Sequence, residues 1–144
     1  MDNNAHTFNT FWSGQVPFAA SFAVQQLRLW VATNPWFTGQ DHDAWFDVPR
    51  STLDSLQSDY HQQWAELGQR LLTGQAFTFD DRRFASGNWS QPLFGSLAAF
   101  YLLNASFLLK LVDLLPINDK KPRQRLLYLV EQAIAAAAPS NFLA

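Results

Sequence analysis

The segment that most constrains the fold is Leu93 to Leu115, the most apolar stretch of the chain. Proline stands just outside each end, at Pro92 and Pro116, and proline interrupts a helix anywhere beyond its first turn. No charged residue occurs from Phe84 to Leu109. The sequence therefore predicts one long apolar helix with fixed limits over residues 93–115.

A second helix is predicted directly after it, over residues 119–138. Asn118 or Asp119 starts this helix, Pro122 lies in its first turn and Pro139 ends it. The short connection predicts an antiparallel helical hairpin. One face repeats apolar residues, with small alanines that let two backbones approach closely: Leu126, Leu129, Val130, Ala133, Ile134 and Ala137.

The first helix of this hairpin is also long enough to span a bilayer. Lys110 and Asp113 interrupt it near its end, where a charge is costly in a membrane, and the neighbouring helix offers it cover. We therefore expect a buried or interface-facing hairpin and no transmembrane segment.

Two further helices are predicted upstream of the hairpin. One covers residues 18–33, because Pro17 suits a first turn and Pro35 ends the helix. The other starts at a capping box in Ser51–Asp54 and ends at Gly74, before a linker at residues 75–79. Its apolar positions recur at three- and four-residue steps: Leu53, Leu56, Tyr60, Trp64, Leu67 and Leu71.

These elements predict an all-α fold of about four helices, in which the two N-terminal helices cover the hairpin of residues 93–115 and 119–138. We expect three parts: a flexible N-terminus over 1–15, an aromatic-rich helical part over 16–79, and the hairpin region over 80–144.

Two Trp-Phe pairs, Trp36-Phe37 and Trp45-Phe46, lie in polar, turn-rich segments between the predicted helices. They can dock onto the protein's own core or adhere to an apolar partner, since large aromatic side chains anchor many protein contacts. Charged residues make up only 15% of the chain, which favours some apolar surface being left for a partner.

Composition argues against several classes of function. The net charge is −2 with scattered basic residues, so nucleic-acid binding is not expected. The chain has no cysteine, which removes disulfides and any thiolate nucleophile. His42 lies between Asp41 and Asp43, but adjacent residues do not easily converge on one ion, so we expect no metal and no cofactor. No acid–base pair marks a self-contained enzyme. No signal peptide is visible, and a cytoplasmic location is expected.

A compact charged cluster at Asp80–Arg83 precedes the hairpin. Arginine can fork onto a carboxylate, and such a pair fixes the direction of the chain where an extended segment meets a helix. The cluster therefore predicts a structural clasp.

Residues from this cluster to the end of the chain resemble the N-terminal region of polyhydroxyalkanoate synthases, and are most similar to class I enzymes. The motifs that carry the resemblance are Asp81-Arg82-Arg83-Phe84, Trp89, Phe100-Tyr101-Leu102-Leu103-Asn104 and Ala138-Pro139-Ser140-Asn141-Phe142-Leu143-Ala144. The upstream helix with Tyr60 and Trp64 is similar more loosely.

The resemblance implies a helical domain that precedes an α/β-hydrolase catalytic domain, which polymerises 3-hydroxyacyl-CoA through a cysteine in a G-x-C-x-G elbow with His and Asp. This chain has neither the cysteine nor the elbow, so no catalytic residue is carried over. The implied role is non-catalytic: to support a homodimer, keep the catalytic domain active, and attach the enzyme to the polyester granule and its phasin-type proteins in the cytoplasm. A free-standing, phasin-like amphipathic coat protein is the alternative.

The residues expected to contact the dimer partner, the catalytic domain or the granule come from the charged cluster, the hairpin and the aromatic segments. They are Asp81, Arg82, Arg83, Phe84, Trp89, Phe100, Tyr101, Leu108, Leu111, Leu115, Trp30, Trp36, Phe37, Trp45 and Phe46.

Overall fold

The computed structural model describes residues 19–142 and is helical throughout its regular parts. The described residues contain no strand, which confirms the all-α fold class. The predicted flexible N-terminus, together with Pro17 and Phe18, lies outside the described residues. The α-helices are α2 (Ala19–Thr33), α3 (Arg50–Leu72), α4 (Pro92–Leu114) and α5 (Lys120–Ala136).

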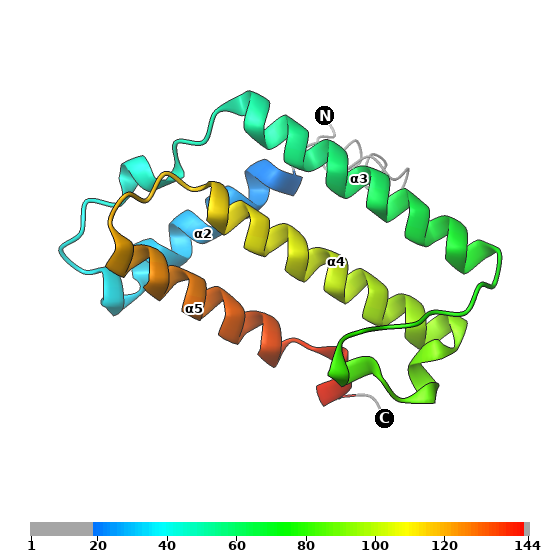
Figure 1. Ribbon diagram of the computed structural model, residues 1–144. Coiled ribbons are helices and arrows are strands. Elements are labelled where there is room, and N and C mark those ends of the chain that lie inside the picture. Colours follow the sequence, from blue (N-terminus) through cyan, green and yellow to red (C-terminus); the bar gives the residue numbers. More distant parts are fainter. Residues whose placement is uncertain (1–18, 143–144) are drawn as a thin grey trace, which may run out of the picture.

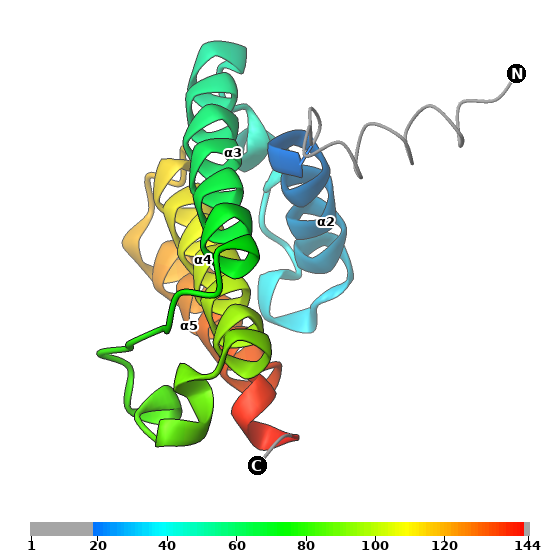
Figure 2. The same cartoon turned by 90° about the vertical axis from the view of Figure 1, so that its right-hand side faces the viewer.

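Helix α4 lies at the centre of the arrangement. Figure 1 shows α3, α4 and α5 side by side with α4 between the other two, and Figure 2 shows α2 on one face of this layer. Helix α4 contacts α2, α3 and α5, while α2 also contacts α3. The predicted hairpin is therefore confirmed as α4 and α5, and both upstream helices pack on its first member.

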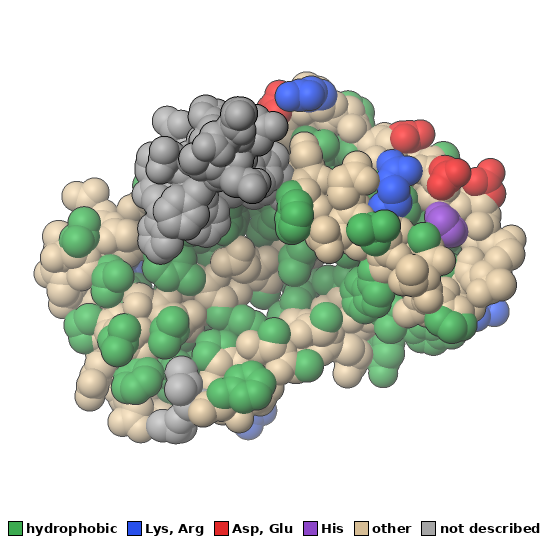
Figure 3. Space-filling model, turned by 180° about the vertical axis from the view of Figure 1, so that it is seen from behind, with side chains coloured by type: hydrophobic (Ala, Val, Ile, Leu, Met, Phe, Trp, Pro, Cys, Tyr) green, Lys and Arg blue, Asp and Glu red, His purple; other side chains and the backbone are tan. Residues whose placement is uncertain are grey.

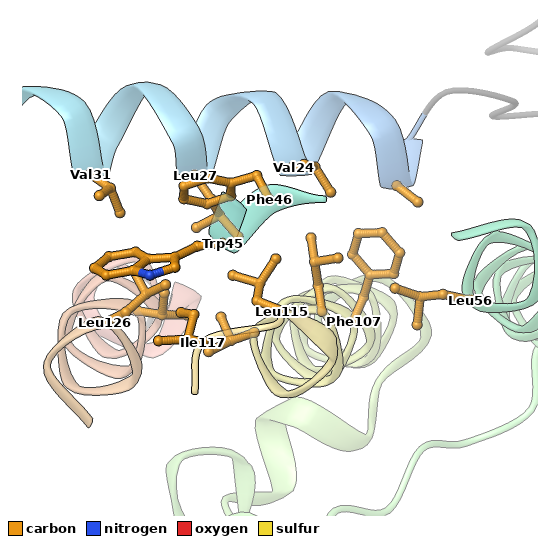
Figure 4. Close-up of a cluster of buried hydrophobic side chains, with 14 of the residues drawn as sticks. Val24, Leu27, Val31, Trp45, Phe46, Leu56, Phe107, Leu115, Ile117 and Leu126 are labelled. Atoms are coloured by element: carbon orange, nitrogen blue, oxygen red, sulfur yellow. The ribbon is translucent and has the colours of Figure 1, made fainter. Parts of the chain in front are cut away.

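A single buried cluster joins the four helices and the loops between them. Leu111, Leu115 and Leu126 are almost completely buried within it. Figure 4 shows Trp45 between α2 and the hairpin, close to Leu126 and Ile117. Burying large apolar side chains in this way contributes roughly 1.5–3 kcal/mol each.

Both Trp-Phe pairs form 3-10 turns, at Pro35–Phe37 and Asp43–Phe46. The Asn34 side chain accepts a hydrogen bond from the Trp36 N–H and so starts the first turn. Three of the four rings are buried: Phe37, Trp45 and Phe46. Of the two alternatives for these rings, docking onto the protein's own core is confirmed for those three, whereas Trp36 is 42% exposed.

Helix α4 is long and apolar enough, by length and composition, to cross a membrane, with a mean hydropathy of 1.6. A helix at the centre of a folded domain has the same properties, and α4 contacts three other helices. One third of its most apolar stretch, 33%, is buried against the rest of the chain. Part of its apolar surface is therefore left for the candidate site described below.

The turn between α4 and α5 depends on Arg123, which the sequence reading did not single out. Its guanidinium donates hydrogen bonds to the Leu115 carbonyl at 2.7 Å and the Ile117 carbonyl at 3.1 Å. Carbonyl groups at the end of a helix lack partners within the helix, so this side chain satisfies groups that burial would otherwise leave unpaired. Arg123 thereby fixes the reversal of the chain.

The start of α3 differs from the prediction. The helix begins at Arg50 with Pro49 as its cap, and no side chain caps it, so the predicted capping box at Ser51–Asp54 is wrong. The Pro49 carbonyl accepts the first helical hydrogen bonds, which moves the start ahead of Ser51. The predicted end is confirmed, because Gly74 has a positive φ of 69° and residues 75–79 form no regular element.

The packing at Gly95 generates a test of the fold. Gly95 is buried in α4, and a Cβ built there would lie 2.5 Å from Cδ2 of Phe77 and 2.6 Å from the Trp89 carbonyl oxygen. Gly95→Ala is therefore expected to lower the free energy of unfolding by roughly 1–3 kcal/mol, although alanine is the better helix former. Chemical denaturation of the purified chain measures it.

Gly68 is the matched control, since it lies inside α3 with open space around its missing Cβ. Gly68→Ala is expected to raise the free energy of unfolding by roughly 0.5–1 kcal/mol. Equal gains in both variants would contradict the contact between α4 and the Phe77 segment.

Candidate functional site

A clasp centred on Arg83 joins the segment before α4 to the hairpin. The guanidinium of Arg83 donates to both carboxylate oxygens of Asp81, at 3.0 and 2.7 Å, and to the Tyr101 hydroxyl at 2.8 Å. Tyr101 lies on α4 and donates its own proton to the Ile134 carbonyl on α5. Arg83 thus joins its own segment to α4 directly and to α5 through Tyr101, which is the structural clasp that the charged cluster predicts.

The electrostatics of the clasp are those of a stable ion pair near the surface. Hydrogen bonds from the Arg83 side chain lower the pKa of Asp81 below its ordinary value of 3.8. The carboxylate contributes stability above that ordinary value and loses the contribution as the pH falls through the lowered pKa. At neutral pH the pair is fully ionised. Arg82 is exposed and forms no ion pair with a described residue.

Aromatic rings pack beneath the clasp. Phe84 and Trp89 are buried and meet edge to face with ring centroids 4.9 Å apart, and Phe84 contacts Tyr101 at 5.8 Å. Phe94, in the first turn of α4, contacts Trp89 in the same way. Such edge contacts add specificity beyond the buried area. This second, smaller core fixes the 80–91 segment on the N-terminal half of α4.

A groove of about 800 Å³ opens between α2 and α5 and has α4 as its floor. Near the middle of the face in Figure 3 the surface is hollowed, and hydrophobic side chains line the hollow. The described residues that line the groove include no Lys, Arg, His, Asp or Glu. Small side chains take part on three helices: Ala23, Ala105, Ala133 and Ala137.

Two polar side chains of the groove, Tyr60 and Asn104, are already bonded within the chain. Tyr60 donates its proton to Oδ1 of Asn104 at 2.9 Å, and Nδ2 of Asn104 donates to the Phe100 carbonyl at 2.8 Å. Burial raises the pKa of Tyr60, so its hydroxyl is neutral at physiological pH. The groove is therefore an apolar binding surface without a charged anchor.

The sequence-predicted interaction residues fall into two groups. Several are buried and support the surface from within: Phe37, Trp45, Phe46, Phe84, Trp89, Leu111 and Leu115. The others reach the surface at least in part: Trp30, Trp36, Asp81, Arg82, Arg83, Phe100, Tyr101 and Leu108. Trp30, Tyr101 and Leu108 line the groove, while Trp36 lies apart from it, beside Tyr128 of α5.

The sequence reading missed two exposed leucines at the end of the bundle where α3 stops and α4 starts. Leu72 is 88% exposed and Leu93 is 66% exposed, and both lie at this end, which is on the right in Figure 1. Leu71, the last of the apolar positions that recur at three- and four-residue steps along α3, is 39% exposed as well. The signal available in the sequence was a leucine at the end of α3 and another in the first turn of α4.

The arrangement offers contact surfaces rather than reactive groups. The described part of the chain contains no group of three or more His, Cys, Asp or Glu that could hold a metal. Nδ1 of His42 is 3.9 Å from Asp43, which is too long for a hydrogen bond. What these side chains can do chemically is to bury apolar surface and orient helices.

The clasp gives a prediction about stability. Tyr101→Phe removes the hydroxyl that accepts from Arg83 and donates to Ile134, so the free energy of unfolding is expected to fall by roughly 1–3 kcal/mol. Tyr128→Phe is the control, because its ring is 52% exposed on α5, and a change within about 0.5 kcal/mol is expected. If thermal denaturation shows equal losses of stability for the two variants, the clasp does not stabilise the fold.

Comparison with known proteins places this geometry in a family. Residues 80–144, which contain the clasp and the hairpin, match the family model described as "Poly-beta-hydroxybutyrate polymerase (PhaC) N-terminus". The chain is 36% identical over 139 residues to the poly(3-hydroxyalkanoate) polymerase subunit PhaC of Cupriavidus necator, an alignment covering 89% of this chain and 23% of that protein. It is 28% identical over 116 residues to the subunit of the same name in Rhizobium etli, covering 71% of this chain and 18% of that protein.

No solved structure matches the chain. The chain spans less than a quarter of the length of these two polymerase subunits. Because the alignment with the Cupriavidus necator protein covers 89% of this chain, it extends well upstream of residue 80 of this chain and includes α2 and α3. The chain belongs to the polyhydroxyalkanoate polymerase family, and its residues 80–144 are the N-terminal domain of that family.

Proposed function

We propose that this chain is the non-catalytic N-terminal domain of a polyhydroxyalkanoate synthase. Its work is to support a homodimer, keep the catalytic domain in an active form and attach the enzyme to the polyester granule and the phasin-type proteins there, in the cytoplasm. Bond formation is carried by the part of the relatives' length that this chain does not span. The observation that carries the proposal is apolar surface that stays exposed on a helical domain with a well-buried core.

The end of the bundle with Leu72 and Leu93 is the surface proposed to meet the granule. A polyester is apolar, and a protein surface binds it by removing apolar side chains from water. Most of the acidic side chains visible in Figure 3 gather at the end of that face opposite to this one. Burying these two leucines contributes roughly 3–6 kcal/mol before ordering costs.

The patch formed by Trp36, Arg125 and Tyr128 is proposed to meet a second copy of the chain. Arg125 lies over the Trp36 ring at 5.4 Å and donates to the Trp36 carbonyl at 3.3 Å, and the ring of Tyr128 meets that of Trp36 at 6.0 Å. Tryptophan, tyrosine and arginine are the residues that most often dominate protein interfaces. Here the three are held in place and remain partly exposed.

Granule attachment is tested with a fluorescent fusion in polymer-accumulating cells. Leu93→Asp is expected to lower the ratio of granule to cytosolic fluorescence by about tenfold, because a carboxylate there must be desolvated on contact. The new carboxylate lies in the first turn of α4, where it favours the helix, so the fold is retained.

Leu29→Asp is the matched control, since Leu29 is similarly exposed at 58% but lies on α2, away from the proposed surface. It is expected to keep granule binding. Equal localisation of both variants, or even distribution of the unmodified fusion, would exclude this surface.

Dimer formation is tested by sedimentation equilibrium of the purified chain over a range of concentrations. Trp36→Ala combined with Tyr128→Ala is expected to raise the dissociation constant by roughly tenfold or more, because both rings leave the proposed interface. Leu93→Asp is expected to leave the dissociation constant unchanged. A strict monomer at high concentration, both alone and beside the catalytic domain, would refute the dimer.

A further inference from the structure

Tyr101 belongs to two features of the structure at once, the groove and the clasp. It lines the groove between α2 and α5, and its hydroxyl accepts a hydrogen bond from Arg83 and donates one to the Ile134 carbonyl. Ile134 lines the groove as well. Figure 2 shows the 80–91 segment, drawn in green, on the side of α4 opposite to α2. One side chain therefore connects the groove on one face of α4 with the clasp on the other.

The groove has the size and the lining of a small-molecule site. Its volume of about 800 Å³ falls within the range of ligand pockets, roughly 300–1,000 Å³, which are mostly apolar with few polar groups. No charged side chain among the described residues lines it, so an ionised ligand would lose its hydration there without gaining a partner. Gln26 offers an amide to a neutral polar group of a ligand. The chemistry of the lining therefore selects an uncharged, largely apolar molecule.

A ligand in the groove would change the surroundings of the Tyr101 side chain, which is only half-buried. Water that reaches this side chain competes for the hydrogen bonds of its hydroxyl. These bonds strengthen when water is excluded and the local dielectric falls. A ligand packed on the ring also restricts its rotation, so less conformational freedom is lost when the hydroxyl bonds to Arg83. Both effects favour the closed clasp.

We propose that the groove binds an uncharged, largely apolar small molecule and that Tyr101 couples this binding to the clasp. The ligand stabilises the clasp, and the clasp strengthens ligand binding by the same factor, because coupling between two sites is reciprocal. The clasp and the rings beneath it hold the 80–91 segment on α4, so ligand binding controls how firmly this segment is held. The inference does not depend on the proposed granule and dimer surfaces.

The binding site is tested with Nile red, an uncharged apolar dye whose fluorescence rises when it leaves water. The dye is titrated into the complete purified chain to measure its dissociation constant. Ala133→Trp fills the groove from α5 and is expected to raise this constant by about tenfold or more. Ala135→Trp is the matched control, because Ala135 is exposed on the same helix but does not line the groove, and it is expected to leave the constant unchanged.

The coupling is tested with a variant that opens the clasp and leaves the lining of the groove intact. Arg83 does not line the groove, yet Arg83→Met is expected to raise the dissociation constant of the dye by about fivefold or more. Arg82→Met is the matched control, since Arg82 is exposed and forms no ion pair with a described residue. If circular dichroism shows that Arg83→Met loses helix, Asp81→Asn weakens the same ion pair by a smaller change and is expected to act in the same direction.

Hydrogen exchange measures the clasp itself. The backbone N–H of Arg83 donates to Oδ1 of Asp81 at 2.9 Å, and the N–H of Phe84 donates to the Asp81 carbonyl at 3.0 Å. Saturating dye is expected to slow the exchange of these two amides by about fivefold or more in the unmodified chain. The dye is expected to have no such effect in the Arg83→Met variant, where the clasp is already open.

Two sets of results would overturn the proposal. Failure of the dye to bind, or equal effects of Ala133→Trp and Ala135→Trp on its binding, would show that the groove is not the ligand site. Equal dye binding by the Arg83→Met and Arg82→Met variants, or amide exchange that the dye does not slow, would show that Tyr101 does not couple the two features.

Discussion

The structure depends on the need to cover α4, a helix whose first four turns carry no charge. A helix that is apolar on every side gains stability from each neighbour that removes its surface from water. Helices α2, α3 and α5 each contact it, and the 3-10 turns at Gly87–Ser90 and Pro139–Asn141 cover its N-terminal half. The connections are arranged accordingly, with Arg123 at one end of α4 and the Arg83 clasp towards the other.

The three neighbouring helices do not cover all of the apolar surface of the bundle. The proposed functions rest on the apolar surface that stays exposed. The gap between α2 and α5 leaves the groove, and the end of the bundle leaves Leu72 and Leu93 in water. Exposed apolar surface costs solubility unless a partner uses it. The two places differ in form, because the groove is concave, whereas the exposed leucines lie at helix ends.

The helices could be predicted from the sequence because single residues determine where each helix begins or ends. Pro92 opens α4, Gly74 follows α3 and Pro139 follows α5, and each acts through the local backbone. The groove could not be predicted, because it arises from the distance between two helices that are not adjacent in sequence. Arg123 was missed for a related reason, since its partners are backbone carbonyls, which have no sequence signature.

The burial of the Trp-Phe rings shows how the same composition can serve two purposes. Sequence alone left these rings free to anchor a partner or to fill the core, and the structure assigns Phe37, Trp45 and Phe46 to the core. Trp36 differs because its turn places it beside Arg125 and Tyr128 at the surface. The presence of an aromatic residue in such a segment therefore does not show whether that residue lies at the surface or in the core. Three of these four rings hold the helices in position, and Trp36 stays exposed at the surface.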